Sequence, residues 1–72
     1  MKIKSIGSNM SELTIGGVNI LFSYETPVAG IDMEGWFKTN QYYSKTTSRH
    51  INKYVGINCR TVTQEWINNI VK

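Results

Sequence analysis

The chain has 72 residues, with eight Lys and Arg against five Asp and Glu, and its sequence pI is about 9.2. This length predicts a single domain, residues 1–72, near the lower limit for an independent hydrophobic core and too small for an enzyme with a deep cleft. The hydrophobic content of 40% is typical of a folded protein, and the net charge of +3 excludes an acidic mimic of DNA.

The first clear β pattern is an apolar run interrupted by Gly16-Gly17. A two-residue glycine turn accepts the positive φ angles of a tight hairpin, so we expect Ile15 to pair with Val18. One face of this hairpin is then apolar, which fixes its register. The residues of that face are Leu13, Ile15, Val18, Ile20, Phe22 and Tyr24.

A second hairpin is predicted from residues 28–31 and 36–39, joined by a turn in which Gly35 supplies a left-handed conformation. Residues 1–6 are expected to add an edge strand. The sheet therefore has four to five antiparallel strands.

Beyond residue 45 the apolar spacing changes to that of helices. A first helix is predicted over about residues 47–55, with Gly56 as its C′ residue, and a second over about 63–71, with Thr63 as its N-cap. The expected fold is α+β: an antiparallel sheet of hairpins followed by two C-terminal helices that cover its apolar face.

The start of the first helix is the strongest candidate for a ligand site. Residues 44–50 combine four hydroxyls, two cations and an imidazole at the point where unpaired N–H groups of a helix favour an anion. The predicted ligand-binding residues are Lys45, Thr46, Thr47, Ser48, Arg49, His50 and Lys53, with Tyr43 as the ligand-facing ring. Plain helix capping beside a solvated face, with the aromatic rings in the core, is the competing interpretation.

No arrangement of reactive side chains predicts catalysis. Asp32 and Glu34 share a turn where acids are usually solvated, and nothing in the sequence places His50 beside Cys59 or a serine. The single cysteine and single histidine provide neither an intrachain disulfide nor a zinc site. We expect no enzyme, no catalytic residues, no metal and no cofactor.

Residues 51–67 resemble a helix-turn-helix, with Gly56-Ile57 as the turn and Val62 six positions after the glycine. This resemblance implies a DNA-binding regulator. Asn52 and Glu65 depart from the pattern, because a small residue and an aliphatic residue are usual at those positions.

Two stretches of the chain carry a further resemblance. They are Phe22-Ser23-Tyr24 with Thr26-Pro27-Val28-Ala29, and Tyr43-Ser44 with Thr46-Thr47-Ser48-Arg49-His50-Ile51. They look like the signature stretches of a family of small, uncharacterised bacteriophage proteins. The resemblance implies a phage origin and a host-facing accessory role, and it transfers no functional residues.

The function expected from these observations is a non-enzymatic phage accessory protein, of host-takeover or anti-defence type, that binds a nucleotide or nucleic acid at its first helix. The alternative from another class is an anti-CRISPR-like inhibitor of a host defence enzyme. We expect the protein in the cytoplasm of the infected bacterium, because no apolar run approaches the roughly 20 residues of a membrane span and no signal peptide is evident. A homodimer is expected because folding of so short a chain buries only about 60% of the surface that the unfolded chain exposes.

Overall fold

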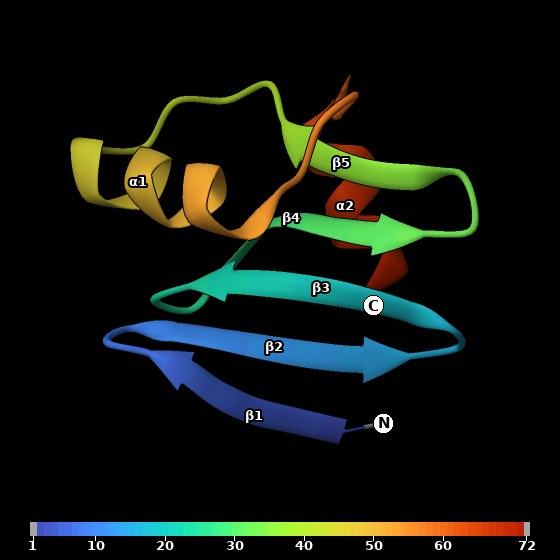
Figure 1. Ribbon diagram of the computed structural model, residues 1–72, viewed down its shortest axis with the longest axis horizontal. Helices are drawn as coiled ribbons and strands as arrows, with labels where there is room; N and C mark the ends of the chain where they lie inside the picture. Colours follow the sequence, from blue (N-terminus) through green and yellow to red (C-terminus); the bar gives the residue numbers. More distant parts are fainter. Residues whose placement is uncertain (1, 72) are drawn as a thin grey trace.

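Five consecutive hairpin strands build most of the sheet in the computed structural model, which describes residues 2–71 (Figure 1). The strands are β1 (Lys2–Gly7), β2 (Met10–Ile15), β3 (Val18–Ser23), β4 (Thr26–Asp32) and β5 (Gly35–Thr39). The predicted α+β class is confirmed, and so is the edge strand, apart from Met1, which lies outside the described residues.

The register of the first hairpin is the predicted one. Ile15 pairs with Val18 and Leu13 pairs with Ile20, and both turn glycines have positive φ. Gly35 also adopts a positive φ, of 110°, in the turn between β4 and β5. Tyr24 is a correction: it does not extend the apolar face but occupies the turn between β3 and β4 with φ 59°, and its side chain is 52% exposed.

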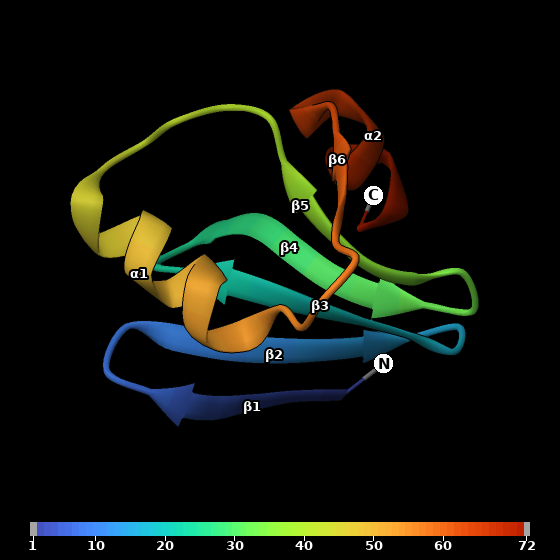
Figure 2. The same ribbon diagram turned by 45° about the horizontal axis from the view of Figure 1, so that its top comes forward.

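A sixth strand, β6 (Arg60–Val62), was not predicted. It lies beside β5 in parallel, with Phe37 opposite Arg60 and Thr39 opposite Val62 (Figure 2). Helix α1 (Lys45–Tyr54) lies in the connection between these two strands, as a parallel pair requires a crossover. The sheet order is therefore β1 to β6 in sequence, with one parallel pair at its end.

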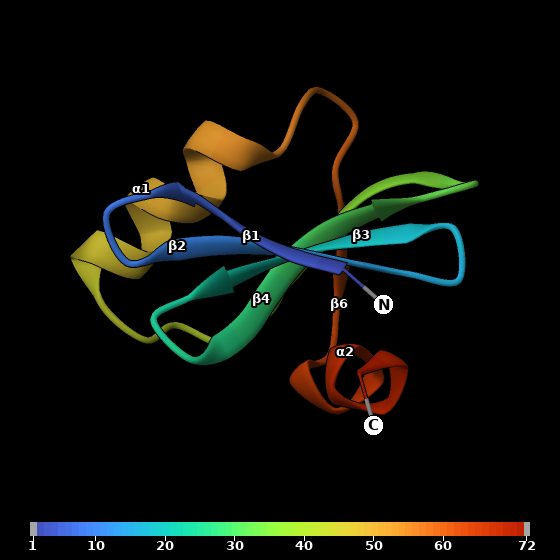
Figure 3. The ribbon, with the colours of Figure 1, turned by 90° about the horizontal axis from the view of Figure 1, so that it is seen from below.

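The two helices lie on opposite faces of the sheet, which corrects the expectation that both cover one face (Figure 3). Ile51 of α1 packs with Leu21, Val28 and other residues of one core, whereas Ile67 of α2 (Gln64–Ile70) packs with Ile20 and Phe37 in a second core. Because both faces of the central strands are covered, β3 and β4 contain runs of buried residues instead of an alternation.

The helix-turn-helix interpretation is wrong. The chain between α1 and α2 contains a loop and strand β6 instead of a tight turn, and the sheet separates the two helices (Figure 3). Thr63 caps α2 as predicted, its hydroxyl accepting a hydrogen bond from the Trp66 N–H at 3.1 Å. Neither helix in the described part of the chain has the length and apolar character needed to cross a membrane.

Contacts at the C-terminal end of α1 tie it to strands on both sides. The Tyr54 hydroxyl donates to the Glu12 carboxylate of β2 at 2.6 Å, and burial together with this carboxylate raises the pKa of the Tyr54 phenol. The Tyr54 ring also forms a T-shaped pair with the Trp36 ring of β5 at a centroid distance of 5.6 Å. Gly56 follows directly, and a Cβ there would lie 2.5 Å from the Trp36 ring nitrogen, so only glycine fits this approach.

Candidate ligand-binding groove

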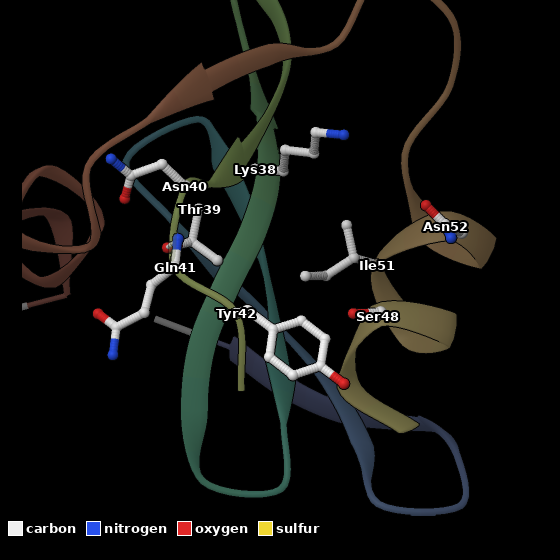
Figure 4. Close-up of a pocket in the computed structure, with 8 residues that line it drawn as sticks. All are labelled: Lys38, Thr39, Asn40, Gln41, Tyr42, Ser48, Ile51 and Asn52. Atoms are coloured by element: carbon white, nitrogen blue, oxygen red, sulfur yellow. Dashed lines mark hydrogen bonds between the residues drawn. The ribbon is translucent and has the colours of Figure 1, made fainter. Parts of the chain in front are cut away.

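A groove of about 270 Å³ lies between α1 and the end of β5 (Figure 4). Its lining comes from β5, from the connector that leads to α1, and from one side of α1. The lining residues are Lys38, Thr39, Asn40, Gln41, Tyr42, Ser48, Ile51 and Asn52. Three separate segments therefore contribute to one open cavity.

The groove exists because α1 packs over β3 and β4 and leaves part of β5 uncovered on the same side. Since side chains alternate along a strand, Phe37 turns into the core beneath α2 and its neighbour Lys38 turns to the side of α1. In Figure 4 the side chains of Lys38 and Tyr42 reach toward α1, whereas those of Asn40 and Gln41 point away from it. The groove therefore has a cationic and aromatic wall on the strand side.

The helical wall is mostly polar. Ser48 and Asn52 are one turn apart on α1, and Ile51 supplies the apolar surface between them. The Tyr42 ring, 69% exposed, stands at the mouth of the groove opposite Ser48 (Figure 4). In a groove lined by an exposed aromatic ring, an ammonium group and a hydroxyl, the ring can stack on a planar ligand and the polar groups can bind an attached anion.

Two of the predicted ligand residues face the interior instead. Thr47 and His50 are 5% and 8% exposed, and both contact the Ser23 hydroxyl of β3, at 3.0 Å from Thr47 Oγ1 and 2.7 Å from His50 Nδ1. The Thr47 N–H donates to Ser44 Oγ at 3.1 Å, which makes Ser44 the N-cap of α1. These groups attach the helix to the sheet.

The sequence could not show that Ser23 and His50 meet, because 27 positions separate them. A histidine in hydrogen-bond contact with a serine can also act as a general base that activates the serine as a nucleophile. Ser23, however, is 2% exposed and lines neither the groove nor the second cavity, which lies at the turns around Gly17 and Met33. The Ser23 hydroxyl therefore serves to join β3 to α1.

The remaining predicted residues lie around the groove or on the outer face of the helix. Ser48 lines the groove, and Lys45 lies one turn before Ser48 on the helix, outside the groove lining. Arg49 and Lys53 are exposed and follow Lys45 at four-residue steps, on the side of α1 turned away from the sheet. Tyr43 does not line the groove; the adjacent Tyr42 does. Thr46 is exposed in the first turn.

Positive charge is concentrated on this side of the molecule. Within residues 2–71, ion pairs join Lys4 to Glu12 at 3.6 Å and Arg60 to Asp32 at 2.6 Å and to Glu34 at 3.8 Å. None of these pairs involves the four cations at or near the groove, which are Lys38, Lys45, Arg49 and Lys53. Uncompensated cations around a concave site attract anions.

No arrangement of metal-binding side chains accompanies the groove. Within the described residues, no three His, Cys, Asp or Glu side chains are placed to hold a metal ion. Burial raises the pKa of the Cys59 thiol, although Lys38 and Arg60 act in the opposite direction.

Fold and groove together define a small α+β protein with a mixed sheet between two helices and a basic, partly aromatic groove beside one of them. The chain belongs to a family of unknown function (DUF8033), whose model matches residues 1–69. No curated protein and no solved structure matches the chain.

Proposed function

We propose that this protein is a non-enzymatic binding protein whose ligand is a nucleotide or nucleic acid held in the groove between α1 and β5. The observation that carries this proposal is the position of Tyr42 and Lys38 on one wall of the groove, with unpaired cations next to it. A nucleotide needs both kinds of group, because its base stacks on aromatic rings and its phosphate is bound by cations.

The size of the groove supports a small ligand unit. Its volume of about 270 Å³ lies just below the roughly 300 to 1,000 Å³ of sites for drug-sized molecules. One base with part of its sugar and phosphate matches this volume better than a dinucleotide does. Lys45, one turn before Ser48 at the start of α1, lies where the helix dipole also favours negative charge.

The proposed biological setting is an accessory role in a bacterium infected by a phage. Its support is the resemblance of residues 22–29 and 43–51 to signature stretches of phage proteins. These stretches meet in space through Ser23, Thr47 and His50. The contact gives them a shared structural purpose, which is to position α1 as a wall of the groove.

Replacement of Tyr42 provides the test of the groove. Tyr42→Ala is expected to weaken binding of a nucleoside monophosphate by about 5- to 150-fold, since stacking on an aromatic ring contributes roughly 1 to 3 kcal/mol per base. Isothermal titration calorimetry with the four ribonucleoside monophosphates measures the change.

Tyr43→Ala is the matched control, because it removes the same ring from the next position outside the groove lining. Its affinity should equal that of the unchanged protein. Equal losses for the two variants would count against the groove. Failure of mononucleotides and oligonucleotides alike to bind would favour the alternative, in which the basic surface meets an acidic protein of the host.

The proposal includes a homodimer formed through β1. This strand is the last on its side of the sheet, and all six of its residues are exposed, including Ile3 and Ile6. An open strand edge pairs readily with a second strand. Light scattering is expected to give the mass of two chains at micromolar concentration, and Ile3→Asp to give one. A single-chain mass for the unchanged protein would rule out this dimer.

A further inference from the structure

We infer that the ligand is a single-stranded nucleic acid, whose backbone runs along the outer face of α1 while one of its bases enters the groove. This inference rests on the proposed function, and it narrows the ligand from a nucleotide of any kind to a strand. Three features of α1 carry it: the length of its row of cations, the direction in which they point, and their electrostatic cost in the unbound protein.

The row of cations is longer than one nucleotide. Lys45, Arg49 and Lys53 are spaced by four residues, which places them on one side of α1 over eight steps of the helix. At about 1.5 Å of rise per residue the row extends over about 12 Å. All three residues are exposed. A single phosphate group contacts one or two of these cations, whereas a chain of phosphates can contact all of them.

Two of these cations point away from the groove. The helix presents Ser48, Ile51 and Asn52 to the cavity. Arg49 directly follows Ser48, and Lys53 directly follows Asn52. Each cation is therefore turned about 100° around the helix from the groove residue that precedes it. A ligand confined to the groove therefore reaches Lys38, which lines it, whereas Arg49 and Lys53 are used only by a ligand that continues out over the helix.

Electrostatic repulsion within the row of cations destabilises α1 in the unbound protein. Helix α1 contains no acidic residue, so Lys45 with Arg49 and Arg49 with Lys53 are like-charged pairs at four-residue spacing. Each such pair destabilises a helix by about 0.2 to 0.5 kcal/mol. Lys45 also places a positive charge in the first turn, where the helix dipole opposes it. A polyanion that binds along the row relieves all of these repulsions.

The groove favours a single strand over a duplex. A base in a duplex is paired and is stacked on its neighbours, and turning it out costs a few kcal/mol of free energy. A base of a single strand is free to enter a cavity of about 270 Å³ and to stack on Tyr42 at its mouth. The row of cations and the groove can therefore act on one ligand only when that ligand is unpaired.

The test compares a mononucleotide, a single strand and a duplex across salt concentrations. The single-stranded probes are twelve-residue oligothymidine and oligouridine. The duplex probe is oligothymidine paired with oligodeoxyadenosine, and the mononucleotides are thymidine and uridine monophosphates. The logarithm of the binding constant for a single strand falls with the logarithm of salt concentration by about 0.7 per phosphate neutralised. We expect the double variant Arg49→Ala/Lys53→Ala to reduce the steepness of this dependence by about 1.4, and to leave mononucleotide affinity unchanged.

The control is Lys2→Ala/Lys4→Ala, which removes the same charge from β1, at the far edge of the sheet from β5. Its salt dependence should match that of the unchanged protein. Circular dichroism should show an intact fold in both double variants, because all four substitutions are at exposed positions.

The outcomes separate this inference from the proposed function. Mononucleotide binding with no gain for the twelve-residue strands, or an unchanged salt dependence in the Arg49/Lys53 variant, overturns the inference and leaves the proposed function in place. Tighter binding of the duplex than of the single strands also overturns it. No binding of any probe overturns both. Binding of oligothymidine or oligouridine that is tighter than binding of the mononucleotides and of the duplex supports the inference. The difference in affinity between the two single strands shows whether the 2′-hydroxyl is recognised.

Discussion

Gly30→Ala is expected to lower the free energy of unfolding by about 2 to 4 kcal/mol, near or above the upper end of what overpacking usually costs. Gly30 lies in β4, paired with Phe37 of β5 and with Ile20 of β3. A Cβ at this position would overlap Phe37 Cζ and would lie 2.5 Å from the Asn19 carbonyl oxygen. The ring is held in a fully buried core and the carbonyl belongs to a central strand, so neither can move aside cheaply.

A loss of this size is large for so short a chain. Stabilities of about 0.05 to 0.15 kcal/mol per residue give a 72-residue protein a total of roughly 4 to 11 kcal/mol. Urea denaturation followed by tryptophan fluorescence measures the change directly, since Trp66 of α2 packs against the Phe37 ring at a centroid distance of 5.0 Å and Trp36 precedes Phe37 in β5.

Gly7→Ala is the matched control for this prediction. The atom nearest to a Cβ at Gly7 is the sulfur of Met10, at 3.2 Å, and a methionine side chain adapts easily. We expect its effect on stability to stay within about 1 kcal/mol. If Gly30→Ala changes stability no more than Gly7→Ala does, the close approach of Phe37 to the β4 backbone is not present in solution.

The hairpins could be predicted because their determinants are local. Gly16-Gly17 and Gly35 fix the turns, and the alternation around Leu13 and Ile20 fixes the register. Strand β6 has only three residues and pairs with β5 across the whole of α1. A three-residue segment is too short to show the alternation of apolar and polar residues that identifies a strand. Its strand conformation therefore depends on a partner that is distant in the sequence.

The position of the helices also depends on distant residues. Each helix has an apolar stripe, and the stripe shows that the helix is packed without showing on which side of the sheet. The deciding feature is that both faces of the central strands are apolar, with Leu21 buried toward α1 and Ile20 toward α2. The sequence prediction assigned Ile20 to the core and overlooked the neighbouring Leu21, whose burial on the opposite face signals a second covered side.

The predicted ligand-binding cluster and the groove coincide only in part. Of the cluster at the start of α1, Ser48 lines the groove, and Lys45 lies one turn before Ser48 on the helix. Thr47 and His50 resemble ligand groups in the sequence because the same polar atoms serve for binding an anion and for docking a helix on a buried hydroxyl. Lys38 was missed because β5 brings it to the groove from a different part of the fold.

Ser23→Ala is expected to lower the free energy of unfolding by about 2 to 3 kcal/mol and to weaken ligand binding as well. The Ser23 hydroxyl is the shared partner of Thr47 Oγ1 and His50 Nδ1, and each unsatisfied buried polar group costs about 1 to 3 kcal/mol. Thr47 keeps a second partner in the Ser44 hydroxyl at 3.2 Å, which limits the total. His50 has no such substitute among the hydrogen bonds of the described residues.

The effect on binding follows from the position of α1 as a wall of the groove. Ser23 joins the first two turns of α1 to β3, and Ser48, which lines the groove, lies between Thr47 and His50 in the sequence. Loss of this link leaves the start of the helix held by Ile51 and by the Tyr54–Glu12 hydrogen bond near its other end. Amide hydrogen exchange should therefore accelerate in the first half of α1 more than in β2 and β3.

Ser5→Ala is the control, because Ser5 is an exposed serine of β1 whose hydroxyl donates only a long bond, of 3.4 Å, to the Gly7 carbonyl. Its stability, exchange rates and nucleotide affinity should all match those of the unchanged protein. Uniform acceleration of exchange across the sheet in Ser23→Ala would contradict a local role in docking α1. Exchange confined to α1 with unchanged nucleotide affinity would instead show that the ligand does not use this wall, and the groove would lose its place as the binding site.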